Sequence, residues 1–348
     1  MTKGVFMTVS ELKNKIKSGD IGGAYILSGE EDYLKKHYLR ELGKIACADE
    51  GFALFNRSVF DGADVSVQDV GEAIKAPPMM SDFKLIEWHY PNLDGMNESE
   101  KRNIEELALS VADYPYAVLL LLTGMEGFDP GSVKRPSRLA ARLSKSFNLI
   151  NFEKSTESQL VQWLKRHFDT ENILTDSDTL LALIFRSGHS MEVLRGEVSK
   201  LAAYAKANGI KRITRREIGE VASPTLECDA FALSTAITDK NREHAFLALA
   251  DMKGRRMEAG AVLATLCRAF SELVSVALLL EEGKDANDME AILKWNAYKI
   301  KICISSAKKW GAAKLTEALS RLRSLDAESK SGGASGYKVI EMFVCQYI

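Results

Sequence analysis

Ala24-Tyr-Ile-Leu27, continuing through Ser28-Gly-Glu-Glu-Asp32, is the stretch that decides the fold class of this chain. Residues 24–27 form a short apolar run, and from Tyr33 onward large apolar residues recur at helical spacing. A strand, a tight glycine loop and a helix, in this order, form the arrangement in which nucleotide-binding folds hold phosphate groups. The segment therefore predicts the first strand and helix of an α/β domain.

The loop itself lacks the residues that grip a phosphate. It has one glycine and no Gly-Lys-Ser/Thr sequence, and three consecutive carboxylates would repel a triphosphate. Lys35 and Lys36 come about one turn too late to replace the missing lysine. Acidic residues are also ordinary at a helix N-terminus, where they complement the helix dipole. We therefore expect a degenerate phosphate loop that holds no nucleotide and no other cofactor, formed by Ser28, Gly29, Glu30 and Glu31.

The alternation of strand and helix continues over residues 1–153. Further strand-like runs lie at 57–60, 84–88, 116–123 and 148–152, and helical runs lie at 67–76, 98–112 and 139–146. Strands separated by helices of about ten residues imply right-handed crossovers between parallel strands. We therefore predict a doubly wound α/β domain with a parallel sheet of about five strands, covered on both faces.

Beyond residue 153 the periodicity is helical. Helical runs at 156–168, 177–186, 190–207 and 214–221 predict a small helical domain over 154–222. Pro224 disfavours a continuous helix and indicates a boundary. Longer amphipathic helices follow, so that a third, entirely α-helical domain is expected over 223–348. The predicted fold class is an α/β domain followed by two all-α domains.

The composition is that of a globular protein. Hydrophobic residues make up 46% of the chain, enough apolar surface to offset its conformational entropy. A formal net charge of −2 excludes bulk attraction to nucleic acid and leaves only local basic patches. The five scattered cysteines indicate a reducing compartment, and the apolar run at 117–122 is too short to cross a bilayer. We expect a cytoplasmic protein.

A second feature is the segment Ala76-Pro-Pro-Met-Met80, between a predicted helix and a predicted strand. Its two prolines end the helix and would put Pro78, Met79 and Met80 at a tip of the α/β domain. Methionine pairs usually fill protein cores, which is one interpretation. The other is an exposed hydrophobic knob that inserts into a partner's pocket. The sequence alone leaves both open.

Lysines and aromatic residues alternate in Lys294-Trp-Asn-Ala-Tyr-Lys-Ile-Lys301 and continue to Lys308-Lys-Trp310, without an acidic residue. A solvated cationic helix face is one interpretation of this segment. Contact with nucleic-acid phosphates, with an aromatic ring for stacking, is the other. The candidate DNA contacts are Lys294, Tyr298, Lys299 and Lys301.

No catalytic constellation is apparent. The five histidines lack metal-ligand spacing, and the chain has no Gly-x-Ser-x-Gly motif and no Cys/His arrangement. We therefore expect no catalytic residue and no metal in this chain.

Taken in order, these segments resemble the delta subunit family of the bacterial DNA polymerase III clamp loader, over essentially the whole chain. No single motif carries the resemblance; order and spacing do. The matching segments are 25–34, 72–80, 116–121, 188–194, 197–201, 213–214, 221–224 and 296–299, with Trp310.

The resemblance implies a three-domain subunit of a DNA-directed DNA polymerase holoenzyme. Its AAA+-like first domain would lack ATPase activity, its second would be a lid-type helical domain, and its third would be a collar that oligomerises in a five-subunit ring. In this family a hydrophobic tip binds the sliding clamp and helps to open it. That tip corresponds to Pro78, Met79 and Met80, where relatives commonly carry phenylalanine or leucine. The implied partners are the sliding clamp (beta), the ATPase (tau/gamma) and delta-prime subunits, and primed DNA, with no membrane.

Two other functions are compatible with the residues alone. The chain could be an atypical AAA+ or P-loop-like NTPase, which saturable binding of ATP would indicate. It could also be a helical DNA-binding module working through residues 294–310, which a steep loss of DNA affinity with salt would indicate.

Overall fold

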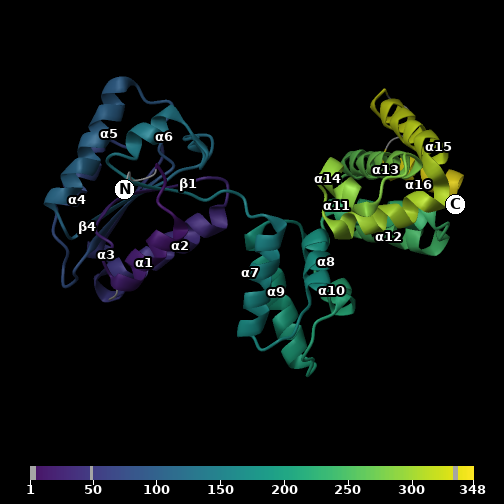
Figure 1. The fold of residues 1–348 in the computed structure, drawn as a ribbon, viewed down its shortest axis with the longest axis horizontal. Coiled ribbons are helices and arrows are strands. Elements are labelled where there is room, and N and C mark those ends of the chain that lie inside the picture. The colour runs from purple at the N-terminus through teal and green to yellow at the C-terminus, as the bar shows by residue number, and fades with distance from the viewer. Residues whose placement is uncertain (1–4, 48–49, 332–335) are drawn as a thin grey trace. The chain divides into compact units, whose positions relative to one another are not determined.

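The computed structural model describes residues 5–47, 50–331 and 336–348, and the chain divides into two compact units, Met1–Ser155 and Thr156–Ile348 (Figure 1). The first unit contains a parallel sheet with helices, and the second is helical. The predicted fold class, an α/β domain followed by helices, is confirmed. The division into three domains, with its second boundary at residues 222 and 223, stays a prediction.

The first unit is built on a five-stranded parallel sheet. In the order in which they lie side by side, its strands are β2 (Arg57–Asp61), β3 (Lys84–His89), β4 (Ala117–Leu122), β1 (Gly23–Ser28) and β7 (Asn148–Asn151). Every residue of β4 is buried, whereas β2, at one edge, alternates between exposed and partly buried residues. Helices on both faces explain why the central strands are continuous apolar runs.

Two hydrophobic cores lie on the two faces of this sheet. One joins α1 and α2 to sheet residues such as Tyr25 and Leu120, and the other joins α4, α5 and α6 to residues such as Ile26 and Trp88 (Figure 1). The helices are α1 (Val9–Ser18), α2 (Asp32–Ala46), α4 (Val67–Lys75), α5 (Glu98–Ser110) and α6 (Arg138–Leu143).

Several short elements were not predicted. They are the one-turn helix α3 (Ala53–Asn56), two 3₁₀ turns (Glu50–Phe52 and Val111–Asp113), and a small hairpin of β5 (Gly131–Ser132) and β6 (Arg135–Pro136). A segment of two to four residues is too short for an apolar pattern to repeat, so periodicity cannot reveal it.

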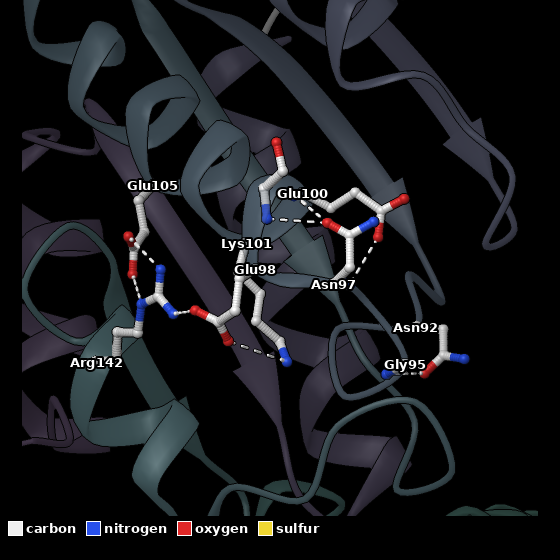
Figure 2. Close-up of polar contacts among 9 residues, drawn as sticks. Asn92, Gly95, Asn97, Glu98, Glu100, Lys101, Glu105 and Arg142 are labelled. Carbon is white, nitrogen blue, oxygen red and sulfur yellow. Dashed lines mark hydrogen bonds and ion pairs between the residues drawn. The ribbon is translucent and has the colours of Figure 1, made fainter.

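The amino end of α5 is fixed both by its own cap and by α6 (Figure 2). The side chain of Asn97 accepts from two backbone N–H groups of α5, at 2.9 and 3.0 Å, and the backbone N–H of Asn97 donates to Glu100. This reciprocal arrangement is a capping box. Arg142 of α6 donates to both Glu98 and Glu105 of α5, with closest distances of 2.6 Å. The two helices are therefore joined where they cover the sheet.

The second unit consists of helices. They are α7 (Glu157–Thr170), α8 (Ser177–Ser187), α9 (Met191–Ala207), α10 (Arg215–Val221), α11 (Leu226–Thr238), α12 (Arg242–Gly254), α13 (Ala259–Glu281), α14 (Ala286–Leu293), α15 (Ala297–Lys330) and α16 (Tyr337–Tyr347). α13 has the length and apolar composition of a membrane span, but its buried residues belong to the core that it shares with α11, α15 and α16. Its apolarity is therefore that of a core helix.

The long helix α15 is interrupted at Gly311. Its backbone is non-helical at this residue, with φ 70° and ψ 170°, so that two helical segments meet at a kink. A left-handed φ is available to glycine without steric cost, which explains the kink at this residue.

A buried carboxylate joins the edge strand β2 to β3. Glu87 is 1% exposed, and it accepts from Arg57 Nε at 2.6 Å and contacts His89 Nε2 at 2.8 Å. Burial raises the pKa of Glu87, but the hydrogen bonds with His89 and Arg57 outweigh burial and hold this pKa below its ordinary value of 4.5. The ionised form of Glu87 is therefore favoured by folding.

Glu87 should make the stability of the protein depend on pH. Because its pKa is lower in the folded than in the unfolded chain, it stabilises the fold above about pH 4.5, and this contribution is lost as the pH falls through the lowered pKa. Glu87→Gln should therefore flatten the fall in unfolding free energy below about pH 4.5, measured by urea denaturation across a pH series. If the unfolding free energy fell equally steeply with pH in the variant and in the wild type, this role of Glu87 would be contradicted.

Candidate functional site

Two candidate regions of the first unit lie at opposite edges of the sheet. The degenerate phosphate loop follows the carboxyl end of β1, whereas the tip, residues 78–80, precedes the amino end of β3. Because the strands of the sheet are parallel, their carboxyl ends share one edge and their amino ends the other. Ligands of open α/β sheets bind outside the carboxyl ends. The tip is therefore placed away from the nucleotide edge.

The backbone of the phosphate loop is hydrogen-bonded to the protein itself. Gly29 has φ 100°, and a Cβ at this position would lie 2.4 Å from the carbonyl oxygen of Phe152. The N–H of Glu31 donates to that same oxygen at 3.0 Å, and the N–H of Asp32 donates to the oxygen of Glu30 at 3.2 Å. A phosphate-binding loop needs such N–H groups to point at the ligand. Here the N–H groups of Glu31 and Asp32 already donate to protein oxygens.

The side chains of the loop supply no cation. Ser28 is buried and donates to the carbonyl oxygen of Ile150 at 3.1 Å. Glu30 is exposed. Glu31 is mostly buried, and burial raises its pKa above the ordinary value although a backbone hydrogen bond from Ser155 acts in the opposite direction.

Lys35 reaches this loop, although it comes about one turn later in the chain than the lysine of a phosphate-binding loop. Its side chain is 2% exposed. Its Nζ donates to the carbonyl oxygens of Gly29 at 2.7 Å and Thr123 at 2.8 Å, and lies 2.8 Å from Asp32 Oδ1. Helical side chains lean toward the N-terminus of their helix, which makes this contact possible. A lysine has three N–H donors, and three protein oxygens lie around this one.

An open pocket of about 770 Å³ lies beside the loop, at the carboxyl ends of β1, β3 and β4. Its lining includes the acidic residues Glu30, Asp32 and Glu126, and its cation is Lys35, which is paired with Asp32. A pocket lined by carboxylates repels a polyphosphate. The pocket therefore has the position of a nucleotide site without its electrostatics.

At the opposite edge, the chain leaves α4 abruptly. Ala76 has an extended backbone with ψ 119°, as expected for a residue that precedes proline. The hydroxyl of Tyr116 donates to the carbonyl oxygen of Lys75 at 2.9 Å and so satisfies one of the last carbonyls of the helix. The two prolines thus begin a short connection that carries the methionines to β3.

Both methionines of the tip are exposed. Met79 is 46% and Met80 is 79% exposed, while Pro78 is partly buried. This exposure excludes the interpretation that the pair fills the core. Met80 also has φ 52°, in the left-handed region that non-glycine residues rarely adopt. The surrounding structure therefore holds the tip in a specific conformation.

The residues that support the tip could not be identified from the sequence. Asn56, at the end of α3, is buried and forms two hydrogen bonds with the backbone of Met79. Leu54 and Phe55, just before it, are 91% and 57% exposed. An isolated asparagine after two apolar residues has no periodic signal, and its partner is 23 positions away in the chain.

The lysine segment does not form one uniform exposed face. Lys294, the C-cap of α14, and Lys301 are exposed. Lys299 is instead paired with Glu272, with Nζ 2.7 Å from Oε1, and its Nζ lies 4.6 Å from the centroid of the Trp295 ring. Lys299 is therefore neutralised within the second unit.

Tyr298 is also engaged within the second unit. Its ring packs against Phe185 with centroids 5.5 Å apart, and the guanidinium of Arg215 lies 5.1 Å from its centroid. Burial, the larger effect, raises the pKa of Tyr298 although Arg215 lowers it. A ring held in this way is not free to stack on a base, so exposure supports DNA contact only for Lys294 and Lys301. The four DNA contacts stay predictions.

The fold and the loop together define a class: a protein with an α/β domain of nucleotide-binding type whose phosphate loop is occupied by its own atoms. Two family models match the chain, "DNA polymerase III, delta subunit" over residues 25–153 and "DNA polymerase III delta subunit, C-terminal domain" over residues 227–347. Together they cover more than half of the chain, which therefore belongs to the DNA polymerase III delta subunit family of clamp-loader subunits. The resemblance inferred from the sequence is confirmed.

Among solved structures, the Bacillus subtilis DNA clamp loader delta protein aligns with 97% of this chain and 99% of its own, at 19% identity and a TM-score of 0.59. This match shows a shared fold. The Thermotoga maritima RuvB Holliday junction branch migration motor aligns with 65% of this chain and 72% of its own, at 14% identity and a TM-score of 0.38. Domain III of the Thermotoga maritima replication initiation protein DnaA aligns with 62% of this chain and 91% of its own, at 13% identity and a TM-score of 0.36. A search among curated proteins found no match.

Proposed function

We propose that this chain binds the sliding clamp for the clamp loader, inserts Met79 and Met80 into an apolar pocket of the clamp, and favours the open clamp without hydrolysing ATP itself. The observation that carries the proposal is the exposure of both methionines on a proline-bounded, conformationally fixed tip. A buried methionine side chain is worth about 1.5–3 kcal/mol relative to an exposed one, so a pocket for these two could supply much of a specific contact.

Opening of the clamp requires more than tight binding. A ligand shifts an equilibrium between two states only by its difference in affinity for them. The tip must therefore bind the open clamp more tightly than the closed one. In this proposal the free energy that favours the open clamp comes from contacts at the tip, and ATP acts through other subunits.

The occupied phosphate loop supports the proposal that this chain does not use ATP. The amides of Glu31 and Asp32 and the ammonium group of Lys35 already contact protein oxygens. A nucleotide would have to break these hydrogen bonds and approach three carboxylates. The alternative of an atypical NTPase requires both.

Membership of the family supports a proposal for the rest of the assembly. We propose that residues 223–348 form the collar that joins the ATPase (tau/gamma) and delta-prime subunits, that hydrolysis in those subunits controls access to the tip, and that the complex acts on primed DNA in the cytoplasm. Exposed Lys294 and Lys301 are the candidates for contact with that DNA.

The proposal is tested with the full chain, purified clamp and no nucleotide. Because the tip favours the open clamp, the chain alone should speed the loss of closed clamps from circular DNA, measured with a fluorescent clamp. ATP should leave this rate unchanged and should show no saturable binding in calorimetry. A release rate equal to that of the clamp alone would contradict clamp opening, and saturable ATP binding would favour the NTPase alternative.

A further inference from the structure

The side chain of Asn56 holds the backbone of the tip. Its Nδ2 group donates to the carbonyl oxygen of Met79 at 2.7 Å, and its Oδ1 accepts from the N–H of the same residue at 2.6 Å. One amide side chain therefore satisfies both backbone polar groups of Met79, as a neighbouring strand would. Asn56 is 1% exposed, so little water can compete for these bonds.

Asn56 is itself fixed to the sheet. It ends α3, and β2 begins at the next residue, Arg57. The guanidinium of Arg57 donates to both carboxylate oxygens of the buried Glu87 on β3, at 2.6 and 3.1 Å. The side chain that holds the tip therefore extends from a backbone that is anchored in the sheet.

The tip is also tied on its other side. Ser81 follows the methionines, and its hydroxyl donates to the carbonyl oxygen of Ala46 at 3.1 Å. Met80 lies between the residues that Asn56 and Ala46 hold, Met79 and Ser81, and has φ 52°. A left-handed backbone costs a non-glycine residue about 1–2 kcal/mol, and such a conformation persists only where the surroundings impose it. The hydrogen bonds of Asn56 to Met79 are contacts that can impose it.

We propose that Asn56 is a positioning residue: it fixes the backbone of Met79 and Met80 in the conformation that binds the clamp before the clamp arrives. This inference rests on the proposed function of the tip. A buried side chain cannot enter a partner's pocket, so Asn56 acts through the methionines. It raises affinity because a tip ordered on folding loses less conformational freedom on binding.

The test compares three variants of the full chain for equilibrium binding to purified clamp. Asn56→Ala removes both hydrogen bonds to the backbone of Met79. It should weaken binding to the clamp about 5- to 30-fold, the effect of losing one or two backbone constraints. Asn97→Ala is the control, because it likewise removes an asparagine side chain with two hydrogen bonds to the backbone, in this case to two N–H groups at the start of α5 and away from the tip (Figure 2). It should bind the clamp like the wild type. Met79→Ser/Met80→Ser tests the tip itself.

The outcomes separate the inference from the proposed function. Loss of affinity in Asn56→Ala and in the methionine variant, but not in Asn97→Ala, would support both. Loss in the methionine variant alone would overturn the role of Asn56 and leave the tip in place. Wild-type affinity in the methionine variant would overturn the proposed function. Equal losses in Asn56→Ala and Asn97→Ala would mean general destabilisation and would also overturn the positioning role.

Hydrogen exchange of the wild-type chain adds a measurement that needs no variant. The Met79 amide should exchange slowly in the free protein although its side chain is exposed, because its N–H is bonded to a buried acceptor. In Asn56→Ala, if folded, exchange at this amide should speed up while the amides of β3 stay protected. Exchange of the wild-type Met79 amide at the rate of an open loop would overturn the inference.

Discussion

Met79→Ser/Met80→Ser should lower the affinity of the full chain for the sliding clamp at least about 30-fold. This corresponds to a loss of about 2 kcal/mol, the usual threshold for a hot spot in an interface. The reason is that the two side chains are exposed in the free protein and would become buried in the clamp. Surface substitutions of this kind change the unfolding free energy by only about 0.5 kcal/mol, so the fold should persist. Calorimetric titration of the clamp measures the change.

A matched control uses methionines that are similarly exposed elsewhere. Met125 is 42% and Met342 is 51% exposed, and neither belongs to the tip. Met125→Ser/Met342→Ser should therefore bind the clamp like the wild type, since only the tip enters the pocket. An equal loss in both double variants would indicate a non-specific effect of lowered surface hydrophobicity. An unchanged affinity in the tip variant, with its melting temperature intact, would exclude the tip as the clamp site.

The architecture of the first unit could be predicted because its signals are local and repeated. The buried run in β4 and the apolar run before Ser28 have the composition of central parallel strands, and helical periodicity lies between them. α3 and the β5–β6 hairpin were missed, since an apolar pattern cannot repeat within two to four residues. The pattern therefore predicts layers well and short connections poorly.

For the phosphate loop, the sequence could predict that phosphate-binding residues are missing, but not which atoms take their place. The absence of a Gly-Lys-Ser/Thr sequence after β1 was visible in the sequence. What occupies the site was not, because Lys35 contacts both Gly29 and Thr123, and the latter is 88 positions away. Periodicity places a residue on a helix, but the oxygens that its side chain meets depend on how the strands are ordered in the sheet.

The tip and the lysine segment each had two interpretations in the sequence, and the structure separates them. The tip is more exposed than its composition required, and part of the lysine segment is less exposed than its helical spacing suggested. Met79 and Met80 could have been core residues by composition, and their exposure follows from where α4 ends and β3 begins. Tyr298 and Lys299 could have been surface residues by helical spacing, but Phe185 and Glu272 contact them. Phe185 and Glu272 lie in the separate helices α8 and α13, and a single sequence does not show that these helices meet α15.

Residues 1–155, produced without the helical unit, should fold and bind the clamp with an affinity within about two- or threefold of the full chain, as expected for a site that is independent of distant residues. Both cores on the faces of the sheet consist of residues within this range. The hydrogen bonds of Asn56 with Met79 also lie within it. A cut after Ser155 therefore removes no buried residue of the sheet and no support of Met79.

The same fragment should fail completely to join the ATPase subunits, because the proposed collar lies in residues 223–348. Size-exclusion chromatography with the tau/gamma and delta-prime subunits measures this loss. Residues 156–348, which enclose their own helical core, are the matched control and should join the complex without binding the clamp. If a folded 1–155 fragment lost its affinity for the clamp, part of the binding surface would have to lie among the helices. Retention of clamp binding would instead mean that the sheet domain alone presents the tip, and that the helical unit serves assembly.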